Sequence, residues 1–141
     1  MYMGNIKAGA MNALTYIFLV FAVLILTGMV SESLARRHDR KRFPAPGKMV
    51  NVGNRKMHLD LSGERHPGEP MILLETGMGS WSFHWRFVQP ALSQFARVCS
   101  YDRLGLGWSN GATASRRSQQ IAVELHDALD AIGEHGPYLL V

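Results

Sequence analysis

The hydrophobic pattern begins with a long apolar segment near the start of the chain. No charged residue occurs between Lys7 and Glu32, and residues 13–30 are apolar apart from two threonines and one glycine. A helix that crosses the hydrocarbon layer of a membrane needs about 20 such residues. The pattern therefore predicts a transmembrane helix over residues 13–30, preceded by an N-terminal tail over residues 1–12.

A cleaved signal peptide is the alternative for this segment, because Ser33-Leu34-Ala35 loosely fits a cleavage site. The apolar stretch, however, exceeds the ~7 to 15 residues of a signal h-region, and the basic block RRHDRKR follows it. We therefore expect an uncleaved, single-pass anchor. Lys and Arg resist translocation, and apart from Lys7 they all lie after the span, so we expect the following domain in the cytoplasm.

After a basic, Pro-containing juxtamembrane linker over residues 31–48, the pattern becomes that of a folded domain over residues 49–141. Between residues 49 and 63, apolar and polar residues alternate around a Gly53-Asn54 turn, which is typical of a β-hairpin. Three short apolar runs then predict buried strands over residues 71–75, 97–102 and 138–141.

Helical periodicity separates these three strands. The first helix is predicted from side chains at near-helical spacing, and we expect its aromatics in the core: Trp85, Val88, Leu92 and Phe95. Ser118 is the predicted N-cap of a second helix, and Gly133 suits the C′ position after its end. Strands that alternate with helices predict a parallel sheet with helices on both faces. Ligands of such sheets bind at the C-terminal strand ends, where the loops TGMGSW and RLGLGWSNG lie.

Charge and composition narrow the possible partners. The formal net charge is +4, and residues 36–42, with five basic groups and one acid, account for it. The excess charge is therefore a flank suited to anionic membrane lipid, and we expect no nucleic-acid partner. Cys99 is the one cysteine and is expected to be a reduced core residue. The six histidines show no metal-ligand spacing, so we expect no metal and no cofactor.

A dinucleotide-binding unit is one interpretation of the glycine loops. Gly77-Met78-Gly79 follows a strand, and Asp102 ends the next strand, as in the phosphate loop and ribose-binding acid of such folds. Two residues disagree with it. Ser82 stands where a third glycine is needed for close packing, and Trp81 crowds the pyrophosphate position.

The second interpretation covers more of the chain. From residue 49 onward the sequence resembles the first half of an α/β-hydrolase fold protein: the hairpin MVNVGNRKMHLDLSG, the segment ILLETGMGSW, the segment RVCSYDRLGLGWS and a helix leading to GPYLLV. DRLGLGWS fits the superfamily's D-x-x-G-x-G-x-S pattern, and TGMG occupies the place of its H-G-x-x motif. The implied fold class is α/β: a partial α/β-hydrolase sheet, with a β-hairpin and then parallel βαβαβ, behind one N-terminal transmembrane helix.

An acyl-transfer enzyme must stabilise the negative oxygen of a tetrahedral intermediate, and rigid backbone N–H groups do so without reorganising. By resemblance to the superfamily, the backbone N–H of Met78 is an oxyanion-hole donor, supported by Gly77 and Gly79. Thr76 stands where the superfamily usually has a histidine. The alternative for this loop is a tight strand-to-helix turn without chemistry.

The second loop is expected to be a scaffold around the site. Gly105 and Gly107 permit positive φ, and the Asp102 carboxylate can accept backbone N–H bonds, with Ser109 closing the motif. Trp108 is a candidate pocket wall.

The resemblance also implies what should follow residue 141: a G-x-S-x-G nucleophile elbow, then an acid and a histidine. No catalytic residue is expected within this segment, so the 141-residue chain alone should be inactive. The implied function is hydrolysis of a small ester-like substrate by a membrane-anchored enzyme. A membrane-tethered interaction domain without catalysis is a third possibility.

Overall fold

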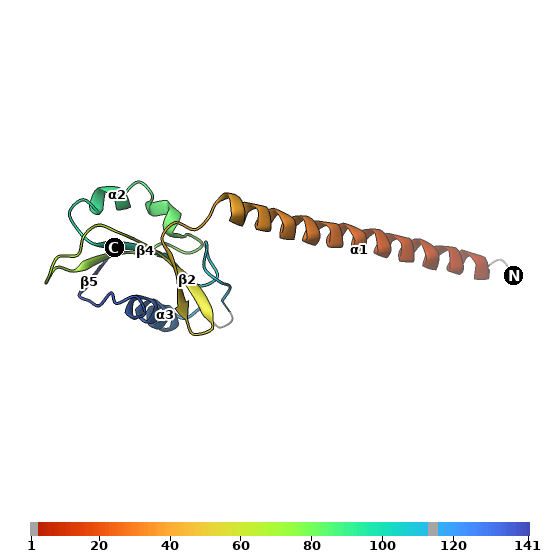
Figure 1. The fold of residues 1–141 in the computed structure, drawn as a ribbon. Helices are drawn as coiled ribbons and strands as arrows, with labels where there is room; N and C mark the ends of the chain where they lie inside the picture. Colours follow the sequence, from red (N-terminus) through yellow and green to blue (C-terminus); the bar gives the residue numbers. More distant parts are fainter. Residues whose placement is uncertain (1–2, 113–115) are drawn as a thin grey trace. The chain divides into compact units, whose positions relative to one another are not determined.

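The computed structural model describes residues 3–112 and 116–141, with side chains from residue 14 onward (Figure 1). The chain forms two compact units, Met1–Pro44 and Ala45–Val141. The boundary falls in the Pro-containing linker, between the apolar N-terminal segment and the folded domain.

The first unit is one long helix, α1 (Met3–Arg42). It contains the predicted span and continues through the basic residues, so the first part of the predicted linker is helical. Its last turn carries Arg40, Lys41 and Arg42, which interact favourably with the negative end of the helix dipole. Among the described residues, α1 is the one helix long and apolar enough to cross a membrane, over Leu14–Arg42.

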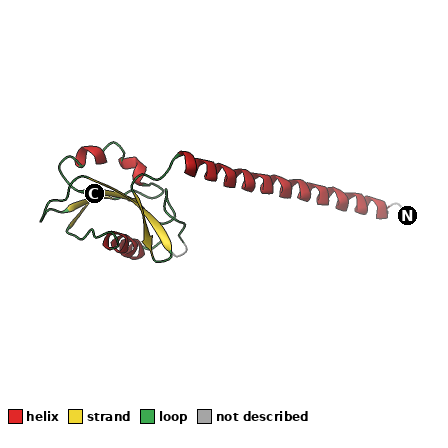
Figure 2. Ribbon diagram, in the orientation of Figure 1, coloured by secondary structure: helices red, strands yellow, loops and turns green. Residues whose placement is uncertain are grey.

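The second unit is built on a five-stranded mixed sheet (Figure 2). The strands are β1 (Lys48–Val52), β2 (Arg55–Ser62), β3 (Met71–Leu74), β4 (Val98–Asp102) and β5 (Tyr138–Leu140). Their spatial order is β1-β2-β4-β3-β5. β1 and β2 form the predicted antiparallel hairpin, β2 is antiparallel to β4, and β3 is parallel to both β4 and β5. The predicted hairpin and parallel strands are confirmed.

The connections place helices on opposite faces of this sheet. η1 (Ser82–Trp85) and α2 (Gln89–Leu92) link β3 to β4 on one face, and α3 (Ser118–Asp130) precedes β5 on the other (Figure 1). α3 buries Leu125, Ala128 and Leu129 against the sheet, as its periodicity predicts.

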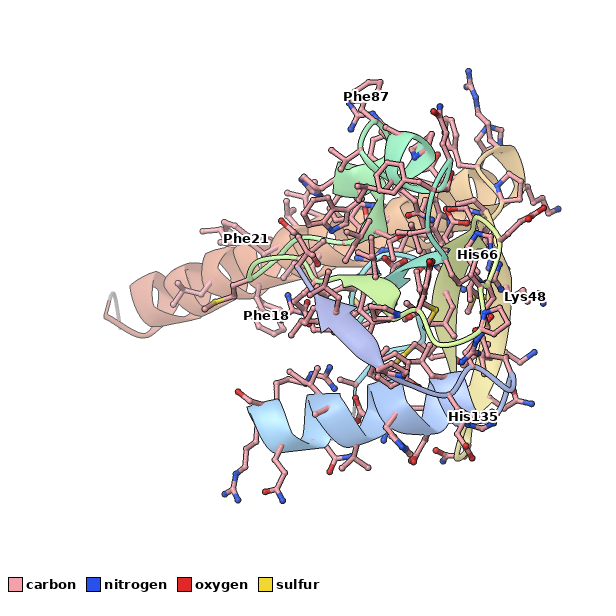
Figure 3. The ribbon with its side chains drawn as sticks, turned by 90° about the vertical axis from the view of Figure 1, so that its left-hand side faces the viewer. Phe18, Phe21, Lys48, His66, Phe87 and His135 are labelled. Carbon is pink, nitrogen blue, oxygen red and sulfur yellow. The ribbon has the colours of Figure 1, made fainter. Side chains whose placement is uncertain are left out.

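The prediction of one helix with core aromatics between β3 and β4 is wrong. The segment forms a short 3₁₀ turn and a single α-helical turn, with Pro90 near its start. Because the two turns have different periods, the spaced side chains do not share one face. Val88 and Phe95 are exposed, and Phe87 points away from the sheet with 76% of its surface accessible (Figure 3).

The hydrophobic core lies between the sheet and α3. It is formed by alternate residues of the strands together with α3, including Met57, Leu59, Leu73 and Tyr101. Cys99 lies within it as a free thiol, so the prediction of a core cysteine is confirmed. Burial, assisted by the charges of Asp60 and Glu134, raises the pKa of the Cys99 thiol to about 12, which keeps it protonated and unreactive.

Candidate functional site

The loop after β3 is a closed turn. The Thr76 hydroxyl donates a hydrogen bond to the Ser80 carbonyl at 3.2 Å, and the Ser80 N–H donates to the Gly77 carbonyl at 3.2 Å. Gly79 has φ of 77°, a conformation that side chains with a Cβ rarely adopt. The turn therefore has a defined backbone, with Thr76 buried as its inner support.

Met78 lies at the tip of this turn, and its side chain is 100% exposed. Among the described residues, the backbone N–H of Met78 has no hydrogen-bond partner. Met78 and Gly79 line a cavity of about 690 Å³ together with residues from the loop after β4, among them Arg103, Gly105 and Leu106. The N–H predicted as an oxyanion donor is thus an available donor in a residue that lines a cavity.

A charged cluster lies beneath the turn. Arg103 Nη2 donates hydrogen bonds to the carbonyls of Thr76 and Gly77, at 2.8 and 2.5 Å. Its Nε lies 3.7 Å from Glu75 Oε1. Glu75 also accepts the Thr76 N–H at 2.8 Å and the Tyr101 hydroxyl. Burial, and then the hydrogen bond to Glu75, raises the pKa of Tyr101, so this hydroxyl stays a proton donor.

The loop after β4 is organised around the Asp102 carboxylate. Asp102 accepts the backbone N–H of Ser82 at 2.7 Å and of Trp108 at 2.9 Å. The Ser109 hydroxyl donates to the Asp102 carbonyl at 2.5 Å and accepts the His58 N–H at 2.8 Å. Gly107 has φ of 50°, and a Cβ there would lie 2.3 Å from Asp102 Oδ2. Only glycine fits beside the carboxylate.

His58 completes this cluster. Its Nδ1 lies 3.0 Å from Asp102 Oδ2, and its Nε2 contacts the Pro46 carbonyl. Burial alone would lower the pKa of His58, but the hydrogen bonds to Asp102 and Pro46 outweigh it and the pKa is raised. Burial likewise opposes ionisation of Asp102, but the hydrogen bonds from His58, Trp108 and Ser82 lower its pKa. Both shifts favour the charged forms, so the two buried side chains form an ion pair whenever His58 is protonated.

This His–Asp pair is not an acid–base dyad. Both side chains are fully buried, with 0% of each exposed. A catalytic histidine needs one ring nitrogen free to take a proton from a nucleophile, whereas Nε2 of His58 donates to a carbonyl. The pair instead joins β2 to the end of β4.

The pocket-wall candidate Trp108 lies at a different cavity. It lines a cavity of about 390 Å³ with residues of β2, η1 and α2, including Asp60, Phe83 and Gln89. Its ring packs against His58 with centroids 5.0 Å apart. The structure does not bring Trp108 and Met78 to one cavity, whereas Gly105 and Met78 share one.

No group of three or more metal-binding side chains gathers in residues 14–112 and 116–141, whose side chains the structure describes. Besides backbone donors, the two loops are held by the side chains of Arg103, Tyr101 and His58 and by the carboxylates of Glu75 and Asp102.

Known proteins support the fold and its class, although no family model matches the chain. A putative carbamate hydrolase RutD from Stutzerimonas stutzeri is 37% identical over 78 residues, 55% of this chain and 29% of that protein. An AB hydrolase superfamily protein from Gibberella zeae is 32% identical and covers 53% of this chain and 24% of that protein. A probable transporter efuK from Hormonema carpetanum is 37% identical over 98 residues, 66% of this chain but 14% of that protein.

Solved structures agree. The enol-lactonase from Burkholderia xenovorans superposes with a TM-score of 0.57 at 24% identity, over 67% of this chain and 36% of that chain. The meta-cleavage product hydrolase from Pseudomonas fluorescens superposes with a TM-score of 0.51 at 27% identity, over 63% and 33%. The chain is a member of the α/β-hydrolase superfamily. It spans less than a third of the length of the three curated relatives, and about a third of the length of the two solved structures.

Within this α/β-hydrolase chain, sequence reasoning found both loops but missed the side chains that hold them. Asp102 was assigned to the scaffold, yet its partner His58 was not distinguished from the other histidines. Arg103, Glu75 and Tyr101 were not singled out either. The available signal was position, since all three lie at the C-terminal end of a parallel strand, beside the hydrolase loops.

Proposed function

We propose that this chain is the N-terminal segment of a membrane-anchored α/β hydrolase that cleaves ester-like bonds in small molecules through a covalent intermediate. The observation that carries the proposal is the backbone N–H of Met78, an available donor at the tip of a hydrogen-bonded turn, in a residue that lines a cavity. Such a donor is what an oxyanion requires.

The names of the relatives agree with this chemistry. A carbamate hydrolase and an enol-lactonase both act on compounds with an acyl carbon. In the proposed reaction a nucleophile attacks that carbon, and the electron pair of the C=O bond moves to oxygen. The oxyanion then accepts the Met78 N–H. Its collapse restores the C=O bond and expels the alkoxide, which takes the proton given up by the nucleophile and leaves as the alcohol. Water then releases the acid from the acyl-enzyme.

The nucleophile belongs, by resemblance to the superfamily, to an elbow after the strand equivalent to β5. β5 pairs with β3 through Met71↔Tyr138 and Leu73↔Leu140, and the Glu75 N–H donates to the Val141 carbonyl at 2.8 Å. The end of β5 therefore lies beside the start of the turn after β3 that carries the Met78 donor, called here the oxyanion turn. A nucleophile placed just after it would lie near the Met78 donor.

The anchor part of the proposal is supported by α1. Its apolar side chains from Leu14 to Val30 are almost all exposed, and the basic residues follow them. Such a helix suits a single membrane crossing, with its basic flank against anionic lipid on the cytoplasmic side.

The dinucleotide alternative loses its main physical support. A pyrophosphate is bound by the N-terminus of a helix, but the turn after β3 leads into the 3₁₀ segment η1 of four residues. Trp81 also stands at the entrance to that segment as its N-cap residue.

Ester hydrolysis by the full-length protein in detergent tests the proposal. With p-nitrophenyl acetate and butyrate, we expect a burst of p-nitrophenol close to one equivalent per active site, followed by slower turnover. The heat-denatured protein is the control. A protein that unfolds cooperatively but releases no p-nitrophenol from either ester would instead support the non-catalytic interaction domain.

A further inference from the structure

The Gly77–Met78 peptide unit links Arg103 to the proposed oxyanion donor. The carbonyl of Gly77 and the N–H of Met78 belong to the same planar unit, in which a trans arrangement points them in opposite directions. Arg103 Nη2 donates to this carbonyl at 2.5 Å and to the preceding carbonyl, of Thr76, at 2.8 Å. Whatever fixes the direction of the Gly77 carbonyl also fixes the direction of the Met78 N–H.

The guanidinium of Arg103 faces the Glu75 carboxylate at ion-pair distance, although its Nε has no hydrogen-bond partner among the described residues. Its Nε lies 3.7 Å from Glu75 Oε1, and 18% of the Arg103 side chain is exposed. Glu75 is fixed in turn by the hydroxyl of Tyr101 and the N–H of Thr76. A permanently charged donor in a partly desolvated position forms strong hydrogen bonds, and these polarise the peptide that accepts them. The N–H at the other side of that peptide becomes a better donor.

Arg65 provides a contrast within the same domain. It also pairs with a carboxylate, Glu134 at 3.0 Å, and donates to a backbone carbonyl, that of His135. These contacts lie before the starts of β3 and β5, at the opposite end of the parallel strands from the oxyanion turn. Arg103, unlike Arg65, lines the cavity with Met78. Arg65 and Arg103 make similar contacts, so it is their positions in the fold that give Arg65 a structural role and Arg103 a role at the site.

We propose that Arg103 is a positioning residue, which orients and polarises the Gly77–Met78 peptide so that its N–H points at the developing oxyanion. The inference rests on the proposed hydrolase function. Arg103 follows the neighbouring strand β4. It would support a turn in which Thr76 stands where the superfamily usually has a histidine.

The test compares three variants of the full-length hydrolase in p-nitrophenyl acetate hydrolysis. Arg103→Met keeps the length of the side chain without its charge or donors, and we expect kcat to fall about 10- to 100-fold while KM changes by less than about 3-fold. Arg103→Lys can still donate to one of the two carbonyls, so we expect it to recover part of this loss. The control Arg65→Met should lower the melting temperature but leave kcat unchanged.

The outcomes are separable. If the wild-type protein is folded and inactive, the proposed function fails. If the wild type is active and Arg103→Met keeps the kcat of Arg65→Met, Arg103 does not position the donor and the inference is overturned. An equal loss in kcat and in affinity for a trifluoromethyl ketone, which binds as an oxyanion, supports it. Should Arg103→Met fail to fold, the kcat of Arg103→Lys decides, with an unchanged value overturning the inference.

Discussion

At the scale of single residues, the buried pair His58 and Asp102 gives the domain a defined pH dependence. The pKa of His58 is raised from its ordinary 6.5, and the pKa of Asp102 is lowered from 3.8. A raised histidine pKa contributes stability that is complete below 6.5 and is lost as pH rises through the folded pKa. A lowered aspartate pKa contributes stability that is complete above 3.8 and is lost as pH falls. The pair therefore stabilises the fold most between these two values.

We expect His58→Gln to lower the free energy of unfolding by about 3 kcal/mol near pH 6, because it leaves a buried carboxylate without its charged partner. The difference from wild type should shrink as pH rises above 6.5. Urea unfolding of the detergent-solubilised chain at pH 5.5, 7.5 and 9 measures it. His135→Gln is the control, since His135 pairs with Asp130 on the surface. A difference that stays constant with pH would show that His58 is not charged in the fold.

At the scale of elements, the loop after β4 depends on a glycine beside a carboxylate. Gly107 has positive φ, and Asp102 occupies the space where its Cβ would lie. The loop supplies the Trp108 N–H to Asp102 and the Ser109 hydroxyl to the backbone of β2 and β4. Displacing it would break several buried hydrogen bonds together.

We expect Gly107→Ala to lower the free energy of unfolding by about 3 kcal/mol, from backbone strain and a lost buried hydrogen bond. Gly53→Ala is the matched control. Gly53 also has positive φ, but no atom lies within 4 Å of the position of its Cβ, so only the conformational cost of about 1 kcal/mol applies. Equal losses for the two variants, measured by urea unfolding, would mean that Asp102 does not restrict this position.

The elements themselves were largely predictable. Alternation with period 2 and continuous apolar runs located the hairpin and all three parallel strands, and the apolar stripe located α3. The segment between β3 and β4 was not predictable by period, because it divides into η1 and a single turn of α2. Its aromatics therefore lie outside the core.

The contacts of the site were less predictable than its loops. His58 and Asp102 face each other because the antiparallel register pairs them across β2 and β4. A shift by one residue would send His58 to the other face, and nothing local in the sequence sets this register. The contact of Arg103 with the turn after β3 likewise depends on β3 lying next to β4. The sequence motifs located the glycine loops, whereas the side chains that hold these loops are brought together by the pairing of the strands.

At the scale of the whole molecule, the chain combines an apolar helix with a partial hydrolase domain. The net charge of +4 belongs to the segment that follows the apolar residues of α1, and the rest of the chain is balanced. This asymmetry suits a protein held at an anionic membrane surface more than one that binds nucleic acid.

Protease protection in sealed vesicles tests this arrangement. We expect protease added on the cytoplasmic side to digest residues 45–141, while the same enzyme on the other side leaves them intact. If α1 spans the bilayer as proposed, alkaline carbonate washing should not release the protein. Digestion from the extracytoplasmic side alone would reverse the orientation, and release by carbonate would exclude a spanning anchor.

The most direct measurement removes the backbone N–H donor from the proposed oxyanion hole. Met78→Pro lacks the backbone N–H, whereas Met78→Ala keeps it. Because the Met78 side chain is fully exposed, both variants lose a side chain that is not buried, and they differ in the N–H. In p-nitrophenyl acetate hydrolysis by the full-length protein, we expect Met78→Pro to lose about 10²- to 10³-fold in kcat and Met78→Ala to stay within about 3-fold of wild type. If the folded Met78→Pro variant matches Met78→Ala, the N–H of Met78 does not stabilise the transition state.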